Sequence, residues 1–116
     1  MRGGKLNELM LLELYLKKVK ECILKKKFTM EPEDKRLLTQ LGISYQEAIQ
    51  IIKKLQSSDY VSGPKPDHLH PEQSVYVFGY NMDDCELYIK LTFKEKESLF
   101  ILSFHEAKYQ MQYPYR

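Results

Sequence analysis

The chain has 116 residues, of which 43% are hydrophobic and 29% charged, a composition typical of a single globular domain. Its formal net charge is only +2, so no strong overall field attracts the protein to nucleic acid. Of its 18 basic residues only Arg2, Arg36 and Arg116 are arginines. Lysine suits phosphate as a point charge, so base recognition through bidentate arginine contacts is disfavoured.

The two cysteines, Cys22 and Cys85, lie far apart in the sequence and form no CxxC pattern. The sequence therefore predicts two free thiols in a reducing compartment, with neither a zinc knuckle nor a disulfide framework. No apolar run is long enough for a signal peptide or a membrane span. We expect a cytoplasmic protein that needs no metal and no cofactor and does not enter a membrane. The sequence leaves its oligomeric state open.

Helices are predicted for the first half of the chain, about residues 5–57. Apolar residues recur at helical spacing over residues 5–27, with lysines and glutamates between them. Residues 28–30 are predicted to be extended. A second, short helix is predicted over residues 33–40, because Gly42 lies just beyond it, where a helix C-terminus favours glycine.

A capping box predicts where the third helix begins. Ser44 and Glu47 have the spacing of this motif, and the helix is predicted to continue to about Gln56. Residues 61–73 follow as the longest predicted loop, because they contain several prolines and other turn-forming residues.

The next segment is rich in β-branched and aromatic residues and predicts an antiparallel sheet over about residues 74–106. Three strands are expected at residues 74–80, 85–93 and 99–105, joined by short turns. The whole chain, residues 1–116, is therefore predicted to be one α+β domain in which N-terminal helices pack on a small antiparallel sheet.

Side-chain alternation divides the second and third predicted strands into two faces. The apolar face of the pair must pack on the helices. Its predicted members are Leu87, Ile89, Leu91 and Phe93, followed by Phe100, Leu102 and Phe104. Apolar sets of paired strands share one face, since a slip of one residue would expose a whole set. The members predicted for the opposite face include Tyr88, Lys90, Leu99, Ile101, Ser103 and His105.

A tyrosine, a lysine and a histidine on one sheet face are a workable set for cleaving RNA without a metal. His105 can act as a general acid or base near neutral pH. Lys90 can neutralise charge that grows on the phosphate in the transition state. Tyr88 can stack on an unpaired base or hold the phosphate through its hydroxyl. The same pattern is also typical of a solvated or partner-covered sheet face.

Three other segments have alternative interpretations. The Asp67–His70 segment contains groups that bind metals, although one loop would supply every ligand and an exposed loop is the alternative. The lysines of the first predicted helix could contact phosphate or form the solvated side of that helix. The tyrosine-rich tail, residues 107–116, could stack on a base or cover a sheet edge.

Three motifs in the second half of the chain are informative together. They are SSDYVSGPKPD (residues 57–67), VYVFGYNMDDCELYIKLTF (75–93) and ILSFHEAKY (101–109). In this order they resemble the motility quorum-sensing regulator (MqsR) family of bacterial toxins. The SGPKPD loop and the SFHEA ending are more similar to a divergent branch of that family than to its best-known members.

The resemblance implies a RelE-like fold and an endoribonuclease that cleaves mRNA and is neutralised by a cognate antitoxin protein. In that family a tyrosine of a VYLKL-type strand belongs to the active site, and it matches Tyr88. A basic residue directly after the final SF also belongs there. It is a lysine in the well-known members and His105 here, which is the better acid–base group near pH 7.

Two further family positions differ in this chain. The family's lysine before the long loop falls near Val61–Ser62, and its glutamine on the first strand falls near Val77. Lys65 is the candidate to replace the lysine. Ser103 and Tyr76 are the other predicted RNA contacts.

The preferred interpretation is a toxin-type, metal-independent endoribonuclease that belongs to a type II toxin–antitoxin system. The alternative is a non-catalytic protein-binding module of the same fold, whose sheet face docks a partner. A nucleic-acid-binding protein without chemistry is disfavoured, because arginine is scarce and the net charge is low.

Overall fold

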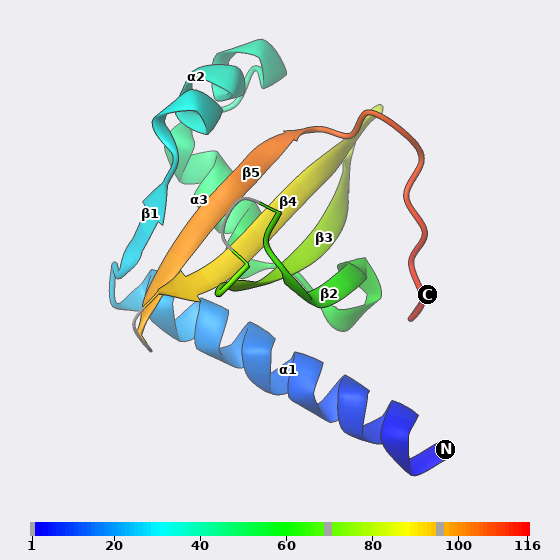
Figure 1. Ribbon diagram of the computed structural model, residues 1–116. Coiled ribbons are helices and arrows are strands. Elements are labelled where there is room, and N and C mark those ends of the chain that lie inside the picture. Colours follow the sequence, from blue (N-terminus) through cyan, green and yellow to red (C-terminus); the bar gives the residue numbers. More distant parts are fainter. Residues whose placement is uncertain (1, 69–70, 95–96) are drawn as a thin grey trace.

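The structure is a computed structural model that describes residues 2–68, 71–94 and 97–116, with the side chains of the first helix described from Asn7 onward. In this part of the chain, three helices pack on a five-stranded sheet, which confirms the predicted α+β class (Figure 1). The helices are α1 (Arg2–Leu24), α2 (Pro32–Leu41) and α3 (Tyr45–Lys53), with a short 3₁₀ helix, η1 (Ser57–Asp59). The strands are β1 (Phe28–Met30), β2 (Tyr60–Pro66), β3 (Ser74–Met82), β4 (Cys85–Lys94) and β5 (Ser98–Glu106).

The sheet has the strand order β1-β5-β4-β3-β2 and is mixed rather than purely antiparallel. Strands β3, β4 and β5 form the predicted antiparallel meander. Strand β1, in the segment predicted to be extended, pairs in parallel with β5 and forms one edge. The other edge is β2, which pairs antiparallel with β3 and occupies much of the loop predicted over residues 61–73.

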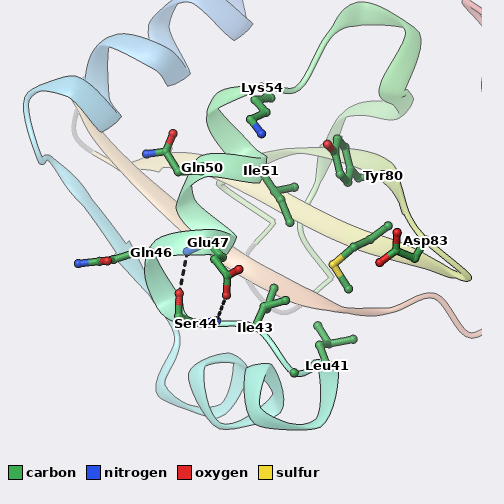
Figure 2. A pocket seen from close by; sticks show the side chains of 12 residues that line it. Leu41, Ile43, Ser44, Gln46, Glu47, Gln50, Ile51, Lys54, Tyr80 and Asp83 are labelled. Atoms are coloured by element: carbon green, nitrogen blue, oxygen red, sulfur yellow. Dashed lines mark hydrogen bonds between the residues drawn. The ribbon is translucent and has the colours of Figure 1, made fainter.

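The helix boundaries follow from local capping. The Ser44 hydroxyl accepts a hydrogen bond from the Glu47 backbone N–H at 3.0 Å, and the Glu47 carboxylate accepts one from the Ser44 N–H at 2.8 Å (Figure 2). The predicted capping box is therefore confirmed. Gly42 ends α2 in the left-handed conformation, with φ of 74°. Both signals act within a few residues, which is why the sequence alone reveals them.

One face of the sheet and the inner sides of the helices form a single apolar core. Leu12, Leu16 and Val19 of α1 and Ile52 of α3 are almost fully buried in it. The members from β3, β4 and β5 are Phe78, Leu87, Ile89, Leu91, Leu99, Ile101 and Phe104. Figure 1 shows α1 running along one end of the sheet and α3 behind it. This packing leaves the opposite sheet face away from the helices.

An extra residue in β5 changes the predicted face of half that strand. Lys90 is paired with Ser103, but the next residue, Leu91, is paired with Ile101. Leu102 is therefore the additional residue of a β-bulge, which reverses the alternation on either side of it. Leu99 and Ile101 are fully buried, whereas Phe100 and Leu102 are partly exposed. The predicted faces of these four residues are wrong, because simple alternation allows for no bulge.

A glycine lets β2 bend against β3. The pairing shifts register between Tyr60 and Ser62 and again between Ser62 and Lys65. Gly63 lies at the second of these shifts and has φ of 117°. A Cβ at this position would lie 2.5 Å from the Val75 carbonyl oxygen. Only glycine fits this conformation without strain. The irregular strand contains two prolines, which is why its sequence resembles that of a loop.

Two sequence predictions lie partly outside the described residues. Leu69 and His70 belong to the Asp67–His70 segment, and Glu95 and Lys96 belong to the turn predicted between β4 and β5. Cys22 and Cys85 are both free thiols, as predicted. None of the described helices has the length and apolar character needed to cross a membrane.

Replacing Gly63 with alanine should lower the free energy of unfolding by about 2–4 kcal/mol. Two costs add: the strain of a positive φ at a residue with a side chain, and the overlap of the new Cβ with the backbone of Val75. The matched control is Gly42→Ala, which also has a positive φ but has open space around the added Cβ. It should cost about 1 kcal/mol. Urea unfolding of both variants measures the difference, and equal losses would contradict the close approach at Gly63.

Candidate functional site

The sheet face away from the helices carries most of the predicted site. Across β4 and β5, Lys90 is paired with Ser103 and Tyr88 with His105. Directly paired residues have side chains on the same face. The predicted juxtaposition of these four side chains is therefore confirmed, and it survives the bulge because all four lie on the same side of Leu102.

A hollow of about 240 Å³ opens on this face between β2, β3 and β4. Lys65 of β2 and both Tyr88 and Lys90 of β4 line it. Val75 and Val77 of β3 contribute buried apolar surface. The other lining residues are Val61, Ser62, Pro66, Asp67, His68 and Tyr109. Two lysines and a tyrosine thus meet at one concave place, which suits a phosphate group.

His105 lies directly beside Tyr88, on the neighbouring strand. The two rings are stacked, with centroids 5.3 Å apart and planes 14° from parallel. His105 Nδ1 lies 2.9 Å from the carbonyl oxygen of Glu106. An Nδ1–H that donates to this carbonyl leaves Nε2 as the ring atom for proton transfer. His105 is partly exposed, as an acid–base group must be to reach a substrate.

A buried carboxylate holds Lys90. Lys90 Nζ lies 3.4 Å from Asp67 Oδ1, and the Asp67 side chain is only 8% exposed. Burial raises the pKa of Tyr88, and the nearby Tyr109 and Asp67 raise it further. Tyr88 therefore keeps its proton at neutral pH and is a hydrogen-bond donor rather than an anion.

Asp34 of α2 binds the backbone of β5 at Phe104, the residue before His105. Its carboxylate is buried and accepts a hydrogen bond from the Phe104 backbone N–H at 3.2 Å. Burial raises the pKa of Asp34, while the Phe104 N–H and the charge of His105 act in the opposite direction. The helix is thereby connected to the end of β5 that carries His105.

The structure does not bring every predicted residue into the pocket. Tyr76 projects from the opposite face of β3, where its ring lies 3.9 Å from that of Tyr15 in the core. Tyr76 therefore does not share the face that carries Tyr88 and His105, contrary to its prediction as a member of the same site. Neighbouring residues of β3 are apolar on both faces, so alternation could not orient the strand. Ser103, paired with Lys90, and His105, paired with Tyr88, are on the site face but outside the lining of the hollow.

Three residues of the pocket, Asp67, His68 and Tyr109, are not among the site residues that the sequence predicts. The sequence offers Asp67 and His68 as metal ligands or an exposed loop, and Tyr109 as part of a tail that stacks on a base or covers a sheet edge. Their convergence depends on how β2 and the tail fold back over the sheet, which no local pattern records. Within residues 2–68, 71–94 and 97–116, no three His, Cys, Asp or Glu side chains form a group that could hold a metal ion.

Comparison with known proteins identifies the family. A profile described as "Motility quorum-sensing regulator, toxin of MqsA" matches residues 13–106, which is most of the chain. The chain belongs to the MqsR toxin family. A search of curated proteins gave no match. As a family member the chain is a toxin of a toxin–antitoxin system, and this implies an antitoxin protein as its partner.

The two positions at which the resemblance implies a lysine and a glutamine lie in the same pocket. Val61 and Ser62, near the implied lysine, line it from β2, and Val77, near the implied glutamine, lines it from β3. Lys65 lines it as well. A lysine is thus present in the pocket, contributed from a position three residues after Ser62 and four after Val61.

A larger hollow, of about 690 Å³, lies elsewhere, between the α2–α3 turn, α3 and the β3–β4 hairpin. Figure 2 shows Ile43, Ile51 and Tyr80 around it, with Asp83 at the hairpin. Its Glu47 carboxylate is already engaged in the capping box. The predicted site residues do not line this hollow. Lys65, Tyr88 and Lys90 line the smaller of these two hollows instead.

Asp34 offers a test of the contact between α2 and β5. Asp34→Ala should lower the free energy of unfolding by about 1–3 kcal/mol, because the Phe104 N–H loses its acceptor. Asp34→Asn keeps an acceptor and removes the buried charge, so it should be at least as stable as the wild type at pH 7. Urea unfolding at several pH values measures both.

The pH dependence of the unfolding free energy tests whether the pKa of Asp34 is raised. A carboxyl whose folded pKa is raised contributes stability that is full below its unfolded pKa, about 4, and is lost as the pH rises through the folded value. The advantage of Asp34→Asn should therefore shrink as the pH falls toward 4. An advantage that grows on acidification would contradict the raised pKa of Asp34.

Proposed function

We propose that this MqsR-family toxin is a metal-independent endoribonuclease that cleaves mRNA in the cytoplasm and is neutralised by its cognate antitoxin. The observation that carries the proposal is the placement of Tyr88, Lys90 and His105 together on the face that the helices leave uncovered. Histidine can transfer a proton, lysine can stabilise charge on the phosphate and tyrosine can donate a hydrogen bond, which together suit RNA cleavage by the 2′-hydroxyl. The partial exposure of His105 supports an acid–base role over a packing role.

Cleavage of this kind is an internal transfer of the phosphoryl group. The 2′-oxygen bonds to phosphorus as a base removes its proton, the bond to the 5′-oxygen breaks, and an acid supplies a proton to that oxygen. His105, through Nε2, serves as one of these two groups. The products are a 2′,3′-cyclic phosphate and a 5′-hydroxyl.

The lysines supply the electrostatic part of the reaction. Lys90 stabilises the charge that grows on the phosphorane, and Lys65 binds the phosphate from the other side of the pocket. Asp67 holds the Lys90 ammonium in place by their contact at 3.4 Å. Tyr88 keeps its proton and donates a hydrogen bond to a phosphate oxygen. Ser103, opposite Lys90, is a further polar group toward the RNA backbone.

The competing function is a non-catalytic module of the same fold whose sheet face binds a partner. The Tyr88–His105 stack favours it, since flat aromatic surface also suits a protein interface. The two functions differ in one measurable property. Only the ribonuclease requires a titratable group at residue 105.

Replacing His105 with alanine should reduce the rate of RNA cleavage by about 10²- to 10⁴-fold, because an acid–base group is lost. The assay uses purified protein, single-stranded RNA and EDTA, in which the wild type should remain active. Tyr76→Phe is the matched control, since it changes an aromatic residue on the opposite face, and it should keep wild-type activity.

Two results would contradict this assignment. A folded His105→Ala protein that cleaves RNA at the wild-type rate would place proton transfer elsewhere. A strict dependence of the wild type on a divalent metal ion would exclude the metal-independent scheme.

A further inference from the structure

The C-terminal tail, residues 107–116, folds back over the site face of the sheet. The match to the MqsR family ends at Glu106, so the tail lies beyond the matched segment. In Figure 1 it leaves the end of β5 and returns past β3 toward η1. Met111, in its middle, is buried. The tail is therefore a packed part of this domain and a neighbour of the proposed site.

Specific contacts hold the tail in this position. The Tyr113 hydroxyl donates a hydrogen bond to Glu86 Oε2 at 2.6 Å, and the Tyr113 ring occupies the space that a Cβ on Gly79 would fill. Gly79 is paired with Tyr88, so Tyr113 covers the sheet directly beside the site. At the end of the tail, Arg116 donates a hydrogen bond to the Ser58 carbonyl at 3.2 Å.

One aromatic side chain of the anchored tail faces outward. Tyr109 is 68% exposed, and it lines the pocket together with Tyr88, Lys90 and Lys65. The other two tail tyrosines have partners. Tyr113 binds Glu86, and the Tyr115 ring lies 5.4 Å from that of Tyr60. Tyr109 alone of these three thus presents a large apolar ring to solvent at the mouth of a lysine-lined pocket.

We propose that Tyr109 is a stacking platform for an unpaired base of single-stranded RNA, held by the tail at the rim of the phosphate pocket. This inference rests on the proposed function, because it deepens the binding part of the same site. Unpaired bases stack on aromatic faces, whereas paired bases are already stacked within a duplex. Lys65 and Lys90 bind the adjoining phosphate, so base and backbone are held by neighbouring groups.

The arrangement makes the tail a determinant of substrate class. A base on Tyr109 places its nucleotide next to the phosphate that Lys90 contacts, and a continuous duplex cannot offer such a base. The site should therefore prefer single-stranded RNA. Stacking on Tyr109 should tolerate several base sequences, since every base has a π face.

The test measures binding separately from cleavage. The probe is a short, fluorescently labelled single-stranded RNA of mixed sequence with 2′-O-methyl groups throughout, which cannot supply the attacking hydroxyl. Tyr109→Leu keeps an apolar side chain but removes the ring, and it should weaken binding in anisotropy titrations by about tenfold. Tyr109→Phe keeps the ring and should bind within about twofold of the wild type.

Controls separate stacking from a structural role of the tail. Because Tyr109 is largely exposed, both variants should unfold at the wild-type urea concentration. With cleavable RNA, Tyr109→Leu should raise KM and leave kcat near the wild-type value, as expected when binding common to substrate and transition state is lost.

The outcomes distinguish this inference from the proposed function. Equal binding of the 2′-O-methyl RNA by wild type and Tyr109→Leu would overturn the stacking platform, even if the wild type cleaves RNA. If Tyr109→Leu alone binds the probe more weakly and the wild type cleaves no RNA, the platform is supported and the ribonuclease is refuted. Equal losses in Tyr109→Phe and Tyr109→Leu would also overturn it, because the ring would then be irrelevant.

Discussion

The pairing of β4 with β5, interrupted by one extra residue, is the constraint on which the rest of the structure depends. Without the bulge at Leu102, a strand that buries Ile101 would also bury His105, since side chains two and four residues apart share a face. The bulge allows Ile101 and Phe104 to be buried together in the core. It also leaves His105 on the outer face, stacked on Tyr88. A single inserted residue therefore places the core residues of β5 on one face of the sheet and the candidate site residue on the other.

This separation lets the two faces of the sheet serve different purposes. The helix-covered face is closely packed and apolar, so it supplies the stability of the domain. The other face has room for charged groups, of which Lys90 is held by Asp67, while Asp34 binds the backbone of β5 at Phe104, beside His105. Both carboxylates are buried and act from outside the meander itself. The edge strand β2 and the C-terminal tail then convert a flat sheet face into a pocket.

The sequence predicts the parts of this structure that depend on near neighbours. The Ser44 capping box, the Gly42 helix end and the shared face of Tyr88 and His105 all follow from spacing. The bulge does not, because Leu102 is as apolar as the residues around it. Strand β2 was hidden by its prolines, and the face of Tyr76 was ambiguous in a strand that is apolar on both sides. The contribution of Tyr109 depends on a tail that folds back across the sheet, and alternation carries no such information.

The most direct test of the proposed ribonuclease is the chemistry of the RNA ends. Purified wild-type protein would be incubated with single-stranded RNA in EDTA, and the termini of any fragments would be analysed by mass spectrometry. A metal-independent ribonuclease of this kind should give 2′,3′-cyclic phosphates and 5′-hydroxyls, because the 2′-oxygen attacks with His105 and Lys90 beside it. Fragments with 5′-phosphates, or intact RNA from a folded toxin, would contradict the assignment of the Tyr88–Lys90–His105 face as a metal-independent ribonuclease site.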